Sequence, residues 1–145
     1  MLRRLRQPSA KAALVAFIAA AVAAAGIAAS ALAGSTGKAT VKVVLKEWTL
    51  TPSTTTLAAG RVTFAVHNAG GIPHEFVVLR TNRHHHAIPT QGSQAVEAGE
   101  LGEIEDLTPG ATKRLTVRLQ PGKYVLLCNL PGHYKAGQFA ALRVR

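Results

Sequence analysis

The residues of this chain that are best suited to chemistry lie near its C-terminus, five positions apart. They are a thiol, an imidazole and an amide: Cys128, His133 and Gln138. A second imidazole, His74, follows a turn-forming segment at residues 68–73. Two imidazoles and one thiolate, with a weak fourth donor such as Met or Gln, form the ligand set of a trigonal blue-copper site. These residue types therefore predict a single copper site.

Two other interpretations of the same residues were weighed. Zinc also accepts one thiolate and two imidazoles, but a structural zinc site usually has four strong ligands, and no fourth Cys or His has suitable spacing. Cys128 is the only cysteine, and taken alone it would be read as a buried core thiol. Its spacing from His133 and the position of His74 favour the ligand interpretation, and copper fits better than zinc.

Strand parity predicts that these donors meet at one pole of a β-sandwich. Cys128 shares the inward face of its strand with Leu126, and Gln138 opens the next strand on an inward face. His74 opens a strand whose same-face neighbour is Phe76, so it also points inward. An inward-pointing Gln needs a polar partner, since an unpartnered buried amide costs roughly 1–3 kcal/mol. A metal or a polar site would supply that partner.

The elements that must carry these residues are short strands. From about residue 40 the chain shows period-2 alternation between Pro and Gly turns, with no convincing helical periodicity. We expect strands at residues 40–48, 61–67, 74–80, 113–119, 123–128 and 138–144, with a short one at 54–57. About seven strands predict an all-β fold, a Greek-key two-sheet β-sandwich over residues 40–145.

Residues 81–102 interrupt this pattern as a long polar insertion with room for a helical turn. The insertion contains His84, His85 and His86, a tract that could capture copper or zinc. We interpret it as a solvated loop, because consecutive loop residues do not easily converge on one ion.

Several further residues have ordinary structural interpretations. We expect His67 to be a surface strand residue and not a ligand, Trp48 to be a packing residue, and Tyr124 to pack while its hydroxyl anchors a corner of the sandwich. The acidic residues Glu97, Glu100, Glu103, Glu105 and Asp106 are interpreted as a solvated face, although they could dock a basic partner.

The first 33 residues have the pattern of an export segment. Arg3, Arg4, Arg6 and Lys11 precede a long apolar run that ends in Ala31-Leu32-Ala33. This pattern predicts a signal peptide over residues 1–33, cleaved near Ala33, or an uncleaved membrane anchor helix. Residues 34–39 then form a linker, and in both cases the folded domain lies outside the cytoplasm. Membrane contact is expected only through an uncleaved N-terminal helix.

The chain is basic, with 17 Lys and Arg against seven Asp and Glu and a net charge of +10. Four of the basic residues and none of the acids precede Gly34, so residues 34–145 carry +6. Nucleic acid is a poor explanation because the basic residues are scattered and form no dense run with aromatics. The length predicts one folded domain, and we expect a monomer.

Two ligand motifs resemble those of the cupredoxins, the plastocyanin and azurin family of type 1 copper proteins. They are residues 72–76, Ile-Pro-His-Glu-Phe, and residues 128–133, Cys-Asn-Leu-Pro-Gly-His. The resemblance covers the chain after about residue 40. It implies His74, Cys128 and His133 as equatorial copper ligands, with His74 the more buried of the two histidines.

The chain departs from the usual pattern of this family at two positions. Gln138 stands where an axial Met is usual, which resembles stellacyanin-like sites, and Met1 is the only methionine. An amide oxygen favours Cu(II) more than a thioether does, so a low reduction potential is expected. Glu75 replaces an Asn that ties two loops together in many relatives. Its backbone N–H could still donate to the thiolate, whereas the role of its carboxylate is open.

The expected function is that of a one-electron carrier and not of an enzyme. The resemblance implies redox protein partners, such as a cytochrome or a membrane oxidase, that dock at the His133 face. Weak, transient docking through a small apolar patch suits such encounters. The alternative is an extracytoplasmic protein that buffers or delivers copper, with the three consecutive histidines assisting its loading.

Overall fold

The computed structural model describes residues 38–145, and these residues contain strands and turns but no helix. The predicted export segment and most of the predicted linker lie outside the described residues. The strands are β1 (Ala39–Lys46), β2 (Thr49–Pro52), β3 (Thr56–Leu57), β4 (Gly60–Asn68), β5 (His74–Arg80), β6 (Thr90–Gln91), β7 (Gln94–Ala95), β8 (Glu100–Leu107), β9 (Thr112–Leu119), β10 (Gly122–Leu127) and β11 (Phe139–Val144). Within this part of the chain no helix is long and apolar enough to cross a bilayer.

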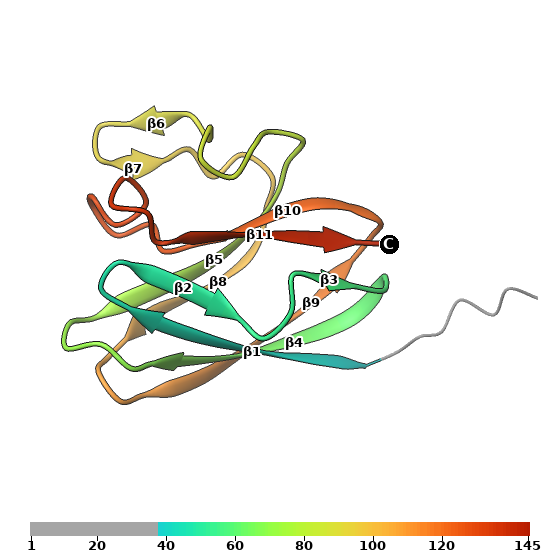
Figure 1. Cartoon of the computed structure of the whole chain (residues 1–145), viewed down its shortest axis with the longest axis horizontal. Helices are drawn as coiled ribbons and strands as arrows, with labels where there is room; N and C mark the ends of the chain where they lie inside the picture. Colours follow the sequence, from blue (N-terminus) through green and yellow to red (C-terminus); the bar gives the residue numbers. More distant parts are fainter. Residues whose placement is uncertain (1–37) are drawn as a thin grey trace, which may run out of the picture. The chain divides into compact units, whose positions relative to one another are not determined.

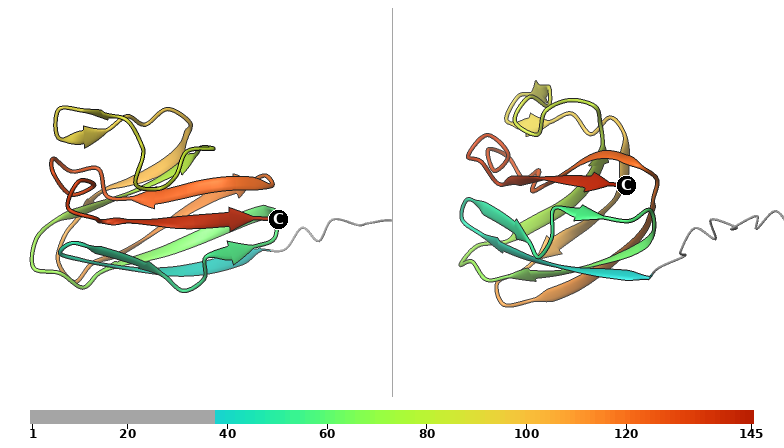
Figure 2. Two further views of the ribbon diagram at one scale, coloured as in Figure 1. Left: turned by 45° about the horizontal axis from the view of Figure 1, so that its top comes forward. Right: turned by 45° about the vertical axis from the view of Figure 1, so that its right-hand side comes forward.

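The strands form two main sheets that face each other across a shared core (Figures 1 and 2). One sheet has the order β2-β1-β4-β9 and the other β3-β11-β10-β5-β8. Most neighbours are antiparallel, while β1 pairs with β4, and β3 with β11, in parallel. The predicted all-β Greek-key sandwich is confirmed, and all seven expected strands occur to within two residues at each end.

Alternating side chains build the core between the sheets. In β4, Val62, Phe64 and Val66 are completely buried, while the residues between them are only partly covered. Burying a side chain of this size stabilises the fold by roughly 1.5–3 kcal/mol, so register shifts that would expose this face are strongly disfavoured. Tyr124 closes one corner as expected, because its hydroxyl donates to the Gln120 carbonyl at 2.8 Å and accepts from the Gln120 N–H at 3.0 Å.

The polar insertion differs from the expectation. It contains no helical turn; instead β6 and β7 form a small hairpin that lies over the outer face of β5 and β10 (Figure 1). Ile88 and Ala95 of this segment pack in a second apolar cluster with Val77, Leu79 and Leu127. The uninterrupted apolar sequence of β5 and β10 is thus explained, since both faces of these strands are covered.

Four strands were not expected: β2, β6, β7 and β8. The most consequential is β8, which pairs with β5 and carries most of the acidic residues. Its acidic side chains are exposed, as the interpretation of a solvated face requires, while Ile104 and Leu107 reach the core. The density of acids hid this alternation, because only the inward positions of an edge strand need apolar residues.

Candidate metal centre

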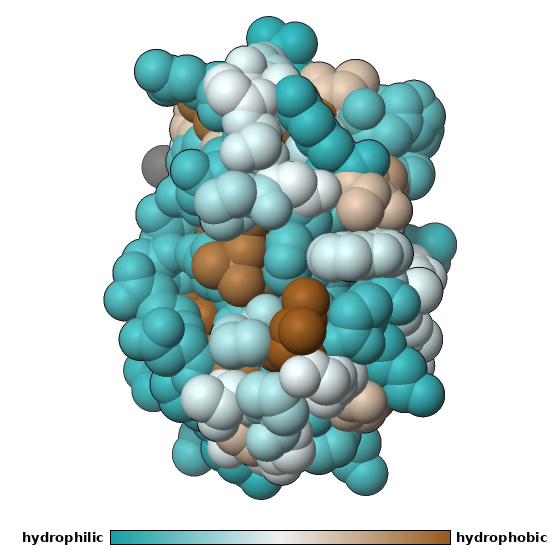
Figure 3. All heavy atoms as spheres, turned by 90° about the vertical axis from the view of Figure 1, so that its left-hand side faces the viewer, coloured by the Kyte–Doolittle hydropathy of each residue, from teal (hydrophilic) through white to brown (hydrophobic). Residues whose placement is uncertain are grey.

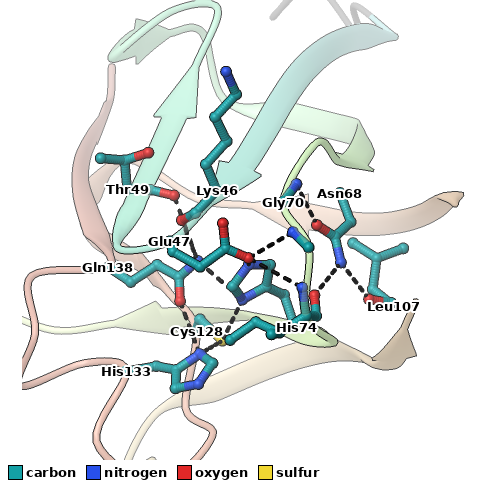
Figure 4. A network of polar contacts seen from close by, with 12 residues as sticks. Lys46, Glu47, Thr49, Asn68, Gly70, His74, Leu107, Cys128, His133 and Gln138 are labelled. Carbon is teal, nitrogen blue, oxygen red and sulfur yellow. Dashed lines mark hydrogen bonds and ion pairs between the residues drawn. The ribbon is translucent and has the colours of Figure 1, made fainter. Parts of the chain in front are cut away.

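The four donors predicted from the sequence meet at one end of the sandwich (Figure 4). His74 is the first residue of β5, Cys128 follows β10, and Gln138 directly precedes β11. His133 lies in the loop that joins β10 to β11. His74, Cys128 and Gln138 are fully buried, and His133 is 8% exposed. His74 is therefore the more deeply buried histidine, as expected, and β5, β10 and β11 bring the donors together because they are neighbours in one sheet.

The thiol and the two imidazoles face one another. Cys128 Sγ lies 3.3 Å from His133 Nδ1 and 3.9 Å from His74 Nδ1, and the backbone N–H of Glu75 donates to Sγ at 3.2 Å. Burial raises the pKa of the Cys128 thiol, while the N–H groups of Glu75 and Leu130 act in the opposite direction. The thiol is thus protonated near pH 7, and a metal ion bound there would have to displace this proton.

Gln138 has a defined amide orientation. Its Nε2 donates to the Lys46 carbonyl at 2.9 Å and lies 3.5 Å from the Thr49 carbonyl, both of which only accept hydrogen bonds. The same Nε2 lies 3.1 Å from His74 Nδ1. The nitrogen end is fixed by these partners, so Oε1 is the atom held beside His133 Nδ1, at 3.0 Å. Gln138 therefore presents an oxygen donor to the cluster.

His74 is supported from behind by Glu47, a residue that the sequence did not single out. Glu47 Oε1 lies 3.6 Å from His74 Nε2, which has no hydrogen-bond partner in the described structure. The same carboxylate accepts the N–H groups of Gly71 at 2.7 Å and Ile72 at 3.1 Å. A carboxylate at this position favours the tautomer with its proton on Nε2. The lone pair of Nδ1 is then directed towards the thiol.

Burial and the neighbouring His133 lower the pKa of His74, and Glu47 only partly opposes them. The ring is therefore neutral near pH 7, which is the form that binds a metal ion.

The turn before His74 is held by Asn68, which is completely buried. Its side chain donates to the carbonyls of Ile72 and Leu107, both at 2.8 Å, and accepts the Gly70 N–H at 2.8 Å. A Cβ at Gly70 would collide with the Glu47 carboxylate, so a larger residue there would displace that carboxylate from its place behind His74. The predicted turn is thus built around a buried amide, and its composition alone did not show that role.

Trp48 differs from its expected role as a packing residue. It is 46% exposed, and its ring meets His133 edge-on with a centroid separation of 4.9 Å. It therefore covers one side of His133 at the surface instead of filling the core. His67, as expected, belongs elsewhere: its Nδ1 contacts Thr112 Oγ1 at 3.0 Å on the surface of the sheet.

The Glu75 carboxylate points away from the donors, towards an acidic groove of about 860 Å³. Glu97 and Glu103 line this groove with it. Burial and a hydrogen bond with Glu103 raise the pKa of Glu75 to about 7. Glu75 thus contacts the thiol through its backbone, as was considered from the sequence, and its side chain belongs to the acidic surface.

The arrangement fits a copper ion. Two imidazole nitrogens and one thiol converge within 4.8 Å of one another, all on buried residues, and an amide oxygen lies beside them. Soft thiolate and imidazole donors with a weak fourth oxygen are the set preferred by type 1 copper.

Comparisons with known proteins give the same fold and family. Residues 13–141 match the family described as Cupredoxin-like domain. Solved structures with a similar fold include auracyanin from Roseiflexus castenholzii, with 20% identity, a TM-score of 0.56, and 75% of this chain and 99% of that chain covered. Rusticyanin from Thiobacillus ferrooxidans matches with 18% identity and a TM-score of 0.54, over 75% of this chain and 79% of that chain.

A curated relative is the iron uptake system component EfeO of Yersinia pseudotuberculosis, which is 30% identical over 90 residues. The match covers 62% of this chain and 20% of EfeO, so the chain spans about a fifth of the length of the curated relatives it matches. Cupredoxin homologues hold one type 1 copper ion, which agrees with the buried donors found here. By the extent of the family match and by its fold, the chain belongs to the cupredoxin-like domain family.

Proposed function

We propose that this protein carries single electrons through one type 1 copper ion held by His74, Cys128 and His133, with Gln138 as the weak fourth ligand. The observation that supports this most directly is the convergence of the three strong donors in a buried cluster. When bound, the copper ion supplies a one-electron couple by alternating between Cu(I) and Cu(II).

The chain's own contribution is a donor set that is already in place. The Lys46 carbonyl holds the amide of Gln138, and the carboxylate of Glu47 lies behind the ring of His74. The Glu75 N–H is directed at the thiol. Donors held from outside by such contacts move little when the charge at the centre changes, and a small rearrangement favours fast electron exchange.

We propose the surface around His133 as the docking face for a redox partner such as a cytochrome or a membrane oxidase. His133 is the only one of the four donors with measurable exposure. Trp48, whose ring packs edge-on against His133, is 46% exposed, and Ile72 in the turn before His74 is 37% exposed. Figure 3 shows this end of the sandwich, where small apolar groups lie among hydrophilic surface. A small mixed surface of this kind suits brief encounters.

A second candidate function is the binding and delivery of copper outside the cytoplasm, without catalysis. A relative is named as a component of an iron uptake system, which connects a similar domain with metal uptake, and the match covers a fifth of that relative. The N-terminal pattern, with its basic residues and apolar run, supports export for both candidates.

Loading the purified protein with Cu(II) tests the proposal. We expect an intense thiolate-to-copper charge-transfer band that Cys128→Ser abolishes and the surface control His67→Ala retains. A colourless copper-loaded protein contradicts the proposal.

Rapid and reversible electron exchange with a soluble cytochrome supports the carrier function. Transfer of copper to a competing chelator within the same time, together with slow electron exchange, supports the delivery function instead.

A further inference from the structure

Three consecutive histidines in the segment before β6 converge in space. One ring nitrogen from each of His84, His85 and His86 lies within 4.8 Å of the other two. The ring of His84 stands 4.0 Å from that of His86 and 4.3 Å from that of His85, measured between centroids. A solvated loop was expected because neighbouring residues in an extended chain point apart. A turn reverses that expectation here, since the Ala87 N–H donates to the His84 carbonyl at 2.8 Å.

This turn is fastened to the folded domain. The buried Tyr134 donates its hydroxyl to the His85 carbonyl at 2.9 Å and accepts the Ile88 N–H at 3.0 Å. The His85 ring also packs against Phe139 with a centroid separation of 5.3 Å. A cluster held on both sides in this way loses less conformational freedom when it binds an ion than a free histidine tract would.

The chemistry of the cluster is that of an open metal site. Burial, followed by the neighbouring histidines, lowers the pKa of His85, which favours the neutral ring that ligates metals. His84 and His86 are exposed, so water can fill the remaining coordination positions. For such nitrogen donors the affinity order of divalent metals peaks at Cu(II).

Positively charged residues around the three histidines disfavour weakly coordinated cations. His84 and His85 line a groove of about 680 Å³ together with Arg83, Lys123 and Arg143. These positive charges disfavour cations that are held only by electrostatic attraction, such as Mg²⁺ and Ca²⁺. Imidazole coordination does not depend on a negative surface, so Cu(II) remains favoured.

We propose that His84, His85 and His86 form a second, surface metal site that binds Cu(II) without a thiolate. The site is independent of the buried donors and goes beyond the proposed electron transfer. It gives the protein a place where a copper ion from solution binds in contact with water.

Titration of the full chain with Cu(II), made without a polyhistidine tag, tests this site. Calorimetry gives the number of ions bound, and electron paramagnetic resonance distinguishes nitrogen-coordinated copper from the thiolate-bound ion. We expect two equivalents in the unaltered protein, the second with a nitrogen-coordinated signal and no thiolate absorption. In the double variant His84→Ala/His86→Ala this second equivalent is lost and the thiolate band is unchanged.

The surface variant His67→Ala is the matched control and should keep both equivalents. A second equivalent that persists in the double variant, or that is missing from the unaltered protein, overturns the proposal. Failure of the proposed function has a different signature, because the thiolate band is then absent or electron exchange is slow, while binding at the three surface histidines is unaffected.

Discussion

Replacing Gln138 by Met tests the most distinctive residue of the candidate centre. The substitution keeps a long, flexible side chain of similar volume but removes the amide. The amide contacts the Lys46 carbonyl at 2.9 Å, His74 Nδ1 at 3.1 Å and His133 Nδ1 at 3.0 Å. Gln138→Met loses all three contacts at a position that is completely buried.

The magnitude follows from the number of contacts. A hydrogen bond contributes about 0.5–1.5 kcal/mol net, so three lost bonds destabilise the metal-free protein by about 3 kcal/mol. The thioether packs better in apolar surroundings than an amide does, which returns roughly 1 kcal/mol. We therefore expect the free energy of unfolding of the metal-free variant to fall by about 2 kcal/mol.

The copper-loaded protein has a second readout, the reduction potential. An amide oxygen stabilises Cu(II) more than a thioether does, so Gln138→Met should raise the potential. Urea unfolding of the metal-free protein and voltammetry of the loaded protein measure the two effects. The exposed Gln91→Met in β6 is the matched control and should change neither.

The two readouts separate the two roles of the side chain. An unchanged or lowered potential in Gln138→Met refutes Gln138 as the axial ligand. Unchanged stability of the metal-free variant refutes the hydrogen-bonded amide described here, whatever happens to the potential.

Three further variants test other parts of the structure. Tyr124→Phe should lower the free energy of unfolding by about 1–2 kcal/mol, because it removes both bonds to the Gln120 backbone; a loss below 0.5 kcal/mol in urea unfolding would contradict this. Asn129→Ala should cost about 3 kcal/mol and speed hydrogen exchange at the Ala95 amide, because its side chain bonds the N–H and the carbonyl of Ala95 and the Glu97 carboxylate; unchanged exchange would show that Asn129 does not hold β7 in place. The pKa of Glu75 is about 7 in the folded state against 4.5 in the unfolded chain, so the folded state keeps a proton that the unfolded chain loses. The free energy of unfolding should therefore fall as pH rises from about 4.5 to 7, by no more than about 2 kcal/mol for this partly exposed group. Glu75→Gln should flatten that slope in the metal-free protein, and an unaltered slope contradicts the raised pKa.

The meeting of the four donors at one end of the sandwich could be predicted from the sequence, because the patterns that place them are local. Alternation within β4 and β11 is visible residue by residue, whereas β5 and β10 are continuous apolar runs, and strand parity then predicts which way Cys128 and Gln138 point. The five-residue spacing of the donors lies within a single loop and needs no knowledge of distant contacts.

The supports of the donors could not be predicted in the same way. Glu47 is 27 positions from His74 in the sequence, and a lone glutamate between two short strands has no distinctive pattern. Its role exists only because the β1–β2 turn meets the turn after β4 in space. The insertion shows the same limit, since its polar composition hid the contacts that Ile88 and Ala95 make over the outer face of β5 and β10.

These supports join the two sheets at the candidate metal centre. Lys46 ends β1 and Glu47 follows it in the first sheet, whereas His74 begins β5 and Gln138 directly precedes β11 in the second sheet. The contacts from Lys46 to Gln138 and from Glu47 to His74 therefore cross between the sheets. A metal ion that binds the folded arrangement and not the unfolded chain stabilises that arrangement by mass action. Copper binding and the contacts between the sheets would thus be coupled, because Gln138 and His74 would hold the ion and also receive the contacts from Lys46 and Glu47.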